Sequence, residues 1–176
     1  FFTAGCLFLL CWIVYLYYFF DKRNFLTEMK NIWLVFCILD VSIIVCSLCG
    51  SYISVYARPA AMLALLTLFL VGYRDAIFLN VVFSVAMFVL DVFVDYQTYV
   101  ATGMTNEMFS AFMISFIGGM FAVFVGNSAK TRGHVLGTGF VISIPTAVII
   151  LLLKVTDYNN LDGWNLLQSA GFGLGG

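Results

Sequence analysis

The chain has 176 residues, of which 63% are hydrophobic and only 10% are charged, with a formal net charge of −1 and a mean hydropathy of +1.06. A soluble domain is typically about 45–50% apolar and about 25% charged, so a soluble fold could not bury this many apolar side chains. The basic residues stand singly or in pairs, which excludes a basic stripe for nucleic acid. The composition therefore predicts an all-α, polytopic transmembrane helical bundle.

Apolar runs separated by short polar breaks divide the chain into six complete spans and the start of a seventh. A helix needs about 20 apolar residues to cross roughly 30 Å of hydrocarbon. The predicted spans cover residues 2–20, 32–55, 60–72, 75–96, 108–125, 135–153 and 164–176. The third is shorter than a full crossing and forms a helical hairpin with the fourth. We expect one transmembrane domain over residues 1–176 that belongs to a longer protein.

Basic residues are distributed unevenly between two sets of connecting segments. The segments after the second and sixth spans contain only Arg58 and Lys154. The segments after the first, third and fifth spans contain Lys22, Arg23, Lys30, Arg74, Lys130 and Arg132. Because Lys and Arg near span ends favour the cytoplasmic side, this bias predicts an N-terminus outside the cell and a C-terminus in the cytoplasm.

Three polar residues inside the spans are candidates for ligand contacts. Asp40 lies in the second span, and Asn80 and Asp91 lie in the fourth. Ionisable side chains at membrane depth are costly and often functional, so both carboxylates could face a bundle cavity and bind a ligand or carry a proton. Alternatively, each could pair with a basic side chain or hydrogen-bond to a Ser, Thr or Tyr residue for packing alone. Asn80 could likewise serve only as a hydrogen-bonding group between helices.

Small residues and a proline mark where helices could pack closely or bend. Gly118 and Gly119 in the fifth span would let helix backbones approach each other. Pro145 in the middle of the sixth span removes one backbone hydrogen bond, which predicts a bend. We expect these three residues to govern packing and any hinge motion.

No group of residues in the sequence has the pattern of a catalytic or metal site. His134 stands beside two basic residues in a turn and has no evident catalytic partner, which favours an interfacial role. Cys46 and Cys49 form a C-x-x-C pair, but no second Cys or His pair accompanies them at metal spacing. The other cysteines, also within apolar runs, are Cys6, Cys11 and Cys37. All five are therefore predicted to act in packing.

Three stretches together resemble the membrane region of the seven-transmembrane HD-hydrolase family. They are RPAAMLALLTLFLVGYRDAIFLNVVFSVAMFVLDVF, then FIGGMFAVFVGNSAKTRGHVLGTGFVISIPTAVIILLL, then SAGFGLGG. The shared features are a proline that opens a short helix, a turn arginine, a Gly-Gly pair, a basic turn and a glycine-rich last span. The residues concerned are Pro59, Arg74, Gly118, Gly119 and Arg132. The resemblance covers residues 57–176 and rests on the order and spacing of these features.

In that family an extracellular domain precedes the membrane region and a cytoplasmic HD domain follows it. The HD domain holds two divalent metal ions with His and Asp residues and hydrolyses cyclic di-AMP. The resemblance implies a sensing and anchoring domain in the bacterial cytoplasmic membrane, which transmits a signal to that hydrolase and has no catalytic residues or cofactor of its own. Its implied partners are the lipid bilayer and the two domains of the same protein.

Two other functions fit the residues. Intramembrane carboxylates and a bent sixth span would suit a small-solute transporter or a membrane-embedded binding subunit. A purely structural anchor would instead form a homodimer through Gly118 and Gly119. The sequence alone leaves these alternatives open.

Overall fold

The computed structural model describes residues 2–21, 29–52, 58–94, 105–128, 141 and 143–152. Within these ranges all regular structure is helical and no strand is present, which confirms the predicted all-α class. A further helical segment occupies residues 143–152. The main helices are α1 (Phe2–Asp21), α3 (Met29–Tyr52), α4 (Ala60–Leu70), α5 (Tyr73–Val94) and α7 (Thr105–Gly126).

Four of the helices are long and apolar enough to cross a membrane, namely α1, α3, α5 and α7. They correspond to the first, second, fourth and fifth predicted spans. Helix α4 has 11 residues, which at 1.5 Å per residue is about 16 Å, roughly half of the hydrocarbon thickness. Most of residues 135–142 and all of residues 164–176 lie outside the described part of the chain. The full count of six to seven spans and the orientation therefore stay predictions.

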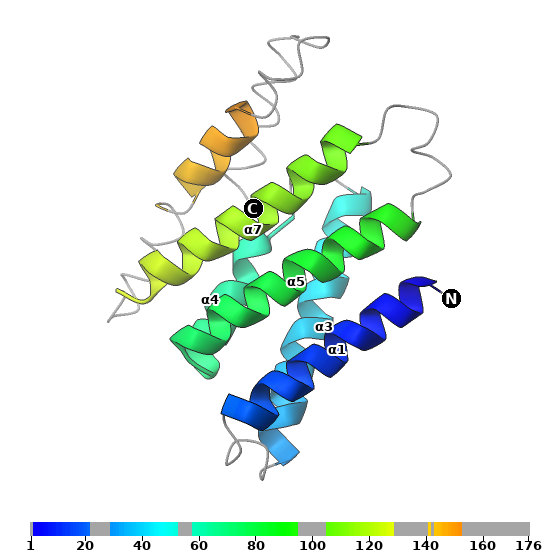
Figure 1. Cartoon of the computed structure of the whole chain (residues 1–176). Coiled ribbons are helices and arrows are strands. Elements are labelled where there is room, and N and C mark those ends of the chain that lie inside the picture. The colour runs from blue at the N-terminus through cyan, green and yellow to red at the C-terminus, as the bar shows by residue number, and fades with distance from the viewer. Residues whose placement is uncertain are drawn as a thin grey trace.

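Helices α4, α5 and α7 pack against one another and form the centre of the bundle (Figure 1). Small buried residues line their contact, including Ala64, Ala76 and Ala122. Small side chains allow close approach, which matters in lipid because no hydrophobic force drives helices together there. Helix α1 packs on α5, whereas α3 runs behind α1 and α5 and contacts α4 and α5 (Figure 1).

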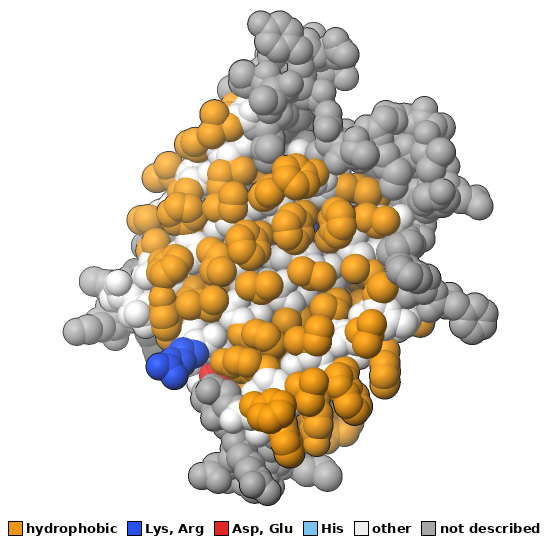
Figure 2. All heavy atoms as spheres, viewed as in Figure 1, with side chains coloured by type: hydrophobic (Ala, Val, Ile, Leu, Met, Phe, Trp, Pro, Cys, Tyr) orange, Lys and Arg blue, Asp and Glu red, His pale blue; other side chains and the backbone are white. Residues whose placement is uncertain are grey.

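The outside of the bundle is apolar. Figure 2 shows hydrophobic side chains spread over most of the visible described surface. On α1 the exposed side chains include Phe8, Trp12, Tyr15 and Phe19, whose rings follow one another along the helix at centroid distances of 6.3–6.4 Å. An apolar surface this extensive is unsuited to water and suited to lipid.

A tight turn joins α4 to α5. The N–H groups of Val71 and Gly72 both donate to the carbonyl oxygen of Thr67, at 2.9 and 3.0 Å, and end α4. Gly72 has a φ of 142°, and its carbonyl oxygen accepts the N–H of Ala76, at 3.0 Å, in the first turn of α5. Only glycine adopts such a φ without strain. Gly72 therefore makes the reversal of the hairpin possible.

Replacing Gly72 with alanine is expected to destabilise the folded protein by about 1–3 kcal/mol, because a side chain would be forced into this sparsely populated backbone region. Thermal unfolding of the purified protein in detergent measures the effect. The matched control is Gly5→Ala, since Gly5 lies within α1 and a Cβ there would meet nothing within 4 Å. We expect the control to leave stability unchanged or to raise it. Equal effects of the two substitutions would contradict this role of Gly72.

Candidate functional site

Helix α5 carries buried polar residues near its start, middle and end. Asp75, Asn80 and Ser84 are fully buried, and the Asp91 side chain is only 14% exposed. Sixteen positions separate Asp75 from Asp91, which at 1.5 Å per residue is about 24 Å. Buried polar groups need hydrogen-bond partners. The polar residues at the start, middle and end of α5 therefore mark contacts with neighbouring helices.

The end of α5 is joined to the start of α4 by an ion pair. Arg58 Nη1 donates to Asp91 Oδ2 at 2.5 Å, and Nη2 donates to Oδ1 at 2.8 Å. The two side chains are 10% and 14% exposed. Two parallel bonds between a guanidinium and a carboxylate form the strongest geometry for such a pair, and burial strengthens the attraction. Arg58 immediately precedes Pro59, the N-cap residue of α4, so the pair closes the open end of the α4–α5 hairpin.

Helix α3 meets this ion pair at Gly50. A Cβ at Gly50 would lie 2.5 Å from Arg58 Nε and 2.8 Å from Nη2. The guanidinium therefore occupies space that any other residue at position 50 would fill. One turn earlier on α3, Cys46 is buried. We name Gly50, Arg58 and Asp91 the arginine junction, because three helices meet there at one side chain.

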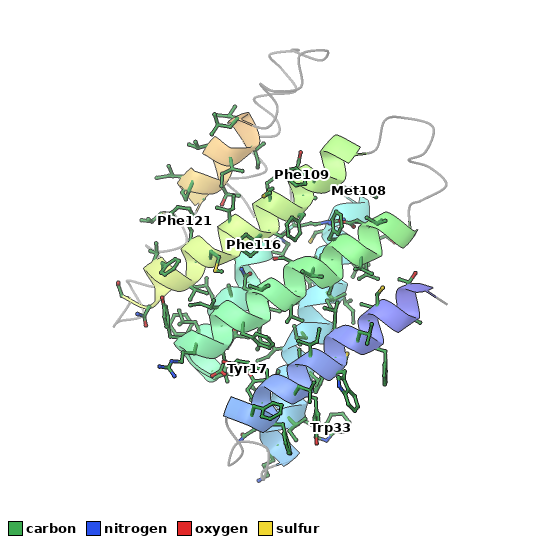
Figure 3. The ribbon with its side chains drawn as sticks, viewed as in Figure 1. Tyr17, Trp33, Met108, Phe109, Phe116 and Phe121 are labelled. Carbon is green, nitrogen blue, oxygen red and sulfur yellow. The ribbon has the colours of Figure 1, made fainter. Side chains whose placement is uncertain are left out.

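The middle of α5 is joined to α7 through Asn80. Its Nδ2 donates to the carbonyl oxygen of Phe116 at 3.2 Å, and Figure 3 shows Phe116 between the two helices. A Cβ at Gly119 would collide with the Asn80 side chain. Ser84 Oγ donates to the carbonyl oxygen of Asn80 at 2.9 Å. Among the described residues, no hydrogen bond reaches Asn80 Oδ1.

The start of α5 is joined to α1 by aromatic and polar residues. Tyr17 stacks on Phe78 with ring centroids 3.9 Å apart and an interplanar angle of 13°, and Figure 3 shows Tyr17 at this contact. Tyr18 is buried and lies within electrostatic reach of Asp75. Asp75 is in the first turn of α5, where the helix dipole favours a negative charge.

The three candidate ligand residues do not lie together. Asp40 is exposed on α3, Asn80 packs against α7, and Asp91 is paired with Arg58. Eleven positions separate Asn80 from Asp91, which corresponds to about 16 Å along α5. For Asp91, the structure favours the second of the two alternatives, in which the carboxylate pairs with a basic residue. Ligand binding by the three residues stays a prediction.

The packing residues contact different neighbours. Gly119 accommodates Asn80, whereas a Cβ at Gly118 would lie 3.6 Å from Thr146 Oγ1 in the segment at residues 143–152. Figure 1 shows this segment beside α7. Pro145 is half-buried within the same segment. The predicted bend also involves residues outside the described part of the chain.

Of the residues used to predict orientation, Lys30 and Arg74 are exposed. The others, Lys22, Arg23, Lys130 and Arg132, lie outside the described residues, as does His134. All five cysteines are free thiols; Cys46 is buried, whereas Cys11 and Cys37 are exposed. In the described ranges, His, Cys, Asp and Glu form no group of three or more that could hold a metal ion.

Sequence reasoning missed Arg58, Gly50 and Asp75 as parts of these contacts. Arg58 lies between two predicted spans and was interpreted as a loop residue. Asp75 lies beside the predicted turn before the fourth span and was interpreted as part of that turn. One signal for the ion pair was available. Because α4 and α5 form a hairpin, the residue before α4 and a residue near the end of α5 must lie at the same end of it.

Long apolar helices joined by buried polar contacts define a polytopic helical membrane protein. A family model described as "7TM receptor with intracellular HD hydrolase" matches residues 1–176. The chain therefore belongs to this family, which confirms the resemblance and extends it over the first two helices. No curated protein and no solved structure matches the chain.

Proposed function

We propose that this domain senses a signal outside the cell or within the membrane and transmits it to the HD hydrolase of the same protein. The observation that carries the proposal is family membership, since the family joins a seven-span receptor region to an intracellular HD hydrolase. In this proposal the domain lies in the bacterial cytoplasmic membrane. The hydrolase holds two divalent metal ions and cleaves cyclic di-AMP.

The arginine junction is the best candidate for the element that changes during signalling. It links α3, α4 and α5 through one buried side chain, so a shift of any one helix alters the geometry of the ion pair. A ligand can change the hydrolase only by binding one helix arrangement more tightly than another. Packed helix interfaces of this kind change between a few discrete arrangements of the helices and do not deform gradually.

Arg58→Lys tests the proposal in the full-length protein in membrane vesicles, with cyclic di-AMP hydrolysis as the measurement. Lysine keeps the positive charge and loses the paired donor geometry. We expect hydrolysis to change by about fivefold or more, the range of typical coupling energies, with membrane insertion unchanged. The matched control is Arg74→Lys at the exposed turn of the hairpin, which should leave the rate within about twofold of the unmodified protein, because a surface charge that is kept contributes little.

The possible results separate the parts of the proposal. If the full-length protein does not hydrolyse cyclic di-AMP, the substrate assignment is wrong. If hydrolysis occurs and Arg58→Lys behaves like Arg74→Lys, the arginine junction has no role in transmission.

The described geometry gives the other two functions no specific support. A transporter was suggested by the intramembrane carboxylates and the bent sixth span, but Asp91 is paired with Arg58 and Asp40 is exposed. Dimerisation through the glycine pair is disfavoured because Gly118 and Gly119 already face Thr146 and Asn80 of the same chain.

A further inference from the structure

The hairpin of α4 and α5 is closed at both of its ends. The ion pair of Arg58 with Asp91 joins the open end, and the turn at Gly72 joins the other. A buried, bidentate pair of this kind is costly to break. The two helices are therefore expected to move as one unit.

Helix α7 is fixed to both helices of the hairpin at glycines that receive their side chains. Asn80 of α5 lies against Gly119 and donates a hydrogen bond to the α7 backbone at 3.2 Å. At Gly126 a Cβ would lie 2.7 Å from Cδ2 of Leu68 and 2.9 Å from Cδ2 of Leu65, both on α4. Side chains that fill notches in a neighbouring helix prevent sliding. We name α4, α5 and α7 the three-helix core.

Helix α3 is held to the three-helix core largely by apolar contacts. Its buried residues Val35, Ile38 and Leu39 pack toward α4 and α5. Apolar contact contributes little to helix association in a membrane, because lipid tails are equally apolar. In the apolar span of α3, 28% of the residues are buried, against 50% in α5 and in α7. Of the three helices that meet at the arginine junction, α3 is therefore the one most easily displaced.

One polar group on the buried side of α3 is not satisfied in the described position. Ser42 is only 1% exposed, and within the described ranges no hydrogen bond reaches its Oγ. The buried hydroxyls of Thr67 and Ser84 instead donate to carbonyl oxygens of their own helices, at 2.8 and 2.9 Å. A buried hydroxyl without a hydrogen bond raises the free energy of the arrangement that contains it. Ser42 therefore disfavours the described position of α3.

Gly50 has the opposite effect on α3. Its lack of a side chain lets the Arg58 guanidinium lie against the helix, in space that a Cβ would occupy. This close contact stabilises the described position. Ser42 and Gly50 are eight positions apart, about 12 Å along α3. One helix thus carries two groups that favour different positions, which is the condition for an element with two arrangements.

We infer that α3 has two positions on a fixed three-helix core. In the described position, Arg58 lies against Gly50 and the Ser42 hydroxyl is unpaired. In the second position, α3 is displaced by about 1–2 Å, the size of helix shifts at packed interfaces. There the Ser42 hydroxyl bonds to a polar group of α4 or α5, and the contact of Gly50 with Arg58 is lost. The inference identifies the moving helix of the arginine junction, and it rests on the proposed function only where it concerns the hydrolase.

Substitutions at the two residues should shift α3 in opposite directions. Ser42→Ala removes the unpaired hydroxyl, so it should raise the population of the described position about fivefold relative to the second. Gly50→Ala places a methyl group 2.5 Å from Arg58 Nε. It should therefore favour the second position, in which Arg58 no longer lies against α3, by at least a similar factor.

Distances between two spin labels measure the position of α3 in the full-length protein in lipid nanodiscs. One label is on Cys37, exposed on α3, and the other on Phe88→Cys, exposed on α5; alanine replaces the other cysteines. The mean distances in Ser42→Ala and Gly50→Ala should differ by about 1–2 Å. The control pair, Phe88→Cys with Phe121→Cys on α7, should give one distance in all proteins. Equal means for the α3 pair, or equal changes in both pairs, would overturn the inference. If Gly50→Ala does not fold, an unshifted mean in Ser42→Ala alone has the same consequence.

Hydrolysis by the same variants separates the movement of α3 from its consequence. In the full-length protein in membrane vesicles, Ser42→Ala and Gly50→Ala should change the rate of cyclic di-AMP hydrolysis in opposite directions, each by about fivefold. Shifted distances with an unchanged rate would contradict transmission to the hydrolase and leave the two positions of α3 intact. A changed rate with unshifted distances would overturn the two positions and leave transmission intact.

Discussion

Replacing Asp91 with alanine is expected to destabilise the folded domain by about 3 kcal/mol. The substitution leaves the Arg58 guanidinium, only 10% exposed, without its carboxylate. Breaking a buried ion pair by removing one partner typically costs about 3–5 kcal/mol, and the remaining exposure of the pair places this case at the lower end. The guanidinium also lies against Gly50 of α3. When it moves toward water in the absence of Asp91, α3 loses this contact, which adds to the loss of stability.

Unfolding of the purified protein in detergent with increasing denaturant measures this loss. The informative comparison is the double variant Arg58→Met/Asp91→Leu, which removes both charges and keeps apolar volume. Replacing a whole buried pair in this way is often neutral or stabilising, so the double variant should be clearly more stable than Asp91→Ala. If the two variants were equally unstable, the uncompensated charge could not be the cause.

The positions of the described helices were largely predictable from the sequence. The first apolar run, residues 2–20, corresponds to α1 (Phe2–Asp21), and the fourth, residues 75–96, corresponds to α5 (Tyr73–Val94). Lipid allows a spanning helix no unpaired backbone groups, so span length and helix length must nearly agree. The short third run likewise predicted the short α4.

Which side of each helix is buried was not predictable from the sequence in the same way. In water, the apolar stripe of a helix shows which side is buried, but a membrane helix is apolar on all sides. For Asp40 the sequence therefore left open whether it faces a bundle cavity or a packing partner; in the structure it is exposed, because α3 buries the side that carries Ser42 and Cys46. Orientation about the helix axis depends on packing against neighbours, which the sequence of one helix does not contain.

The partners of polar residues were also beyond sequence reasoning. Asp91 was a candidate for an ion pair, but Arg58 is 33 positions away and was counted with the loop residues. Gly119 was expected to allow a close approach, but nothing in the sequence connected it with Asn80. Such contacts depend on the register between two helices, because a shift by one residue rotates a side chain by about 100° around the helix axis.

Gly119→Ala is also expected to cause a large loss of folding stability, because it places a methyl group in space occupied by the Asn80 side chain. Asn80 is fully buried, and its Nδ2 is bonded to Phe116 at 3.2 Å, so it can move aside only by losing that bond. Overpacking of this kind costs about 1–3 kcal/mol. Denaturant unfolding in detergent should show this loss for Gly119→Ala. Gly118→Ala should change stability little, since its Cβ would lie 3.6 Å from Thr146 Oγ1, an ordinary contact.

A double variant identifies the cause of the loss. In Asn80→Ala the space beside Gly119 is empty, so adding Gly119→Ala to that background should cost far less than adding it to the unmodified protein. Residues in contact show such coupling with interaction energies of about 0.5–3 kcal/mol. If the cost of Gly119→Ala were the same in both backgrounds, the close approach of α5 and α7 would have to depend on other residues. A large coupling would instead show that one buried amide and one glycine fix the register of these helices, which is where the sequence was least informative.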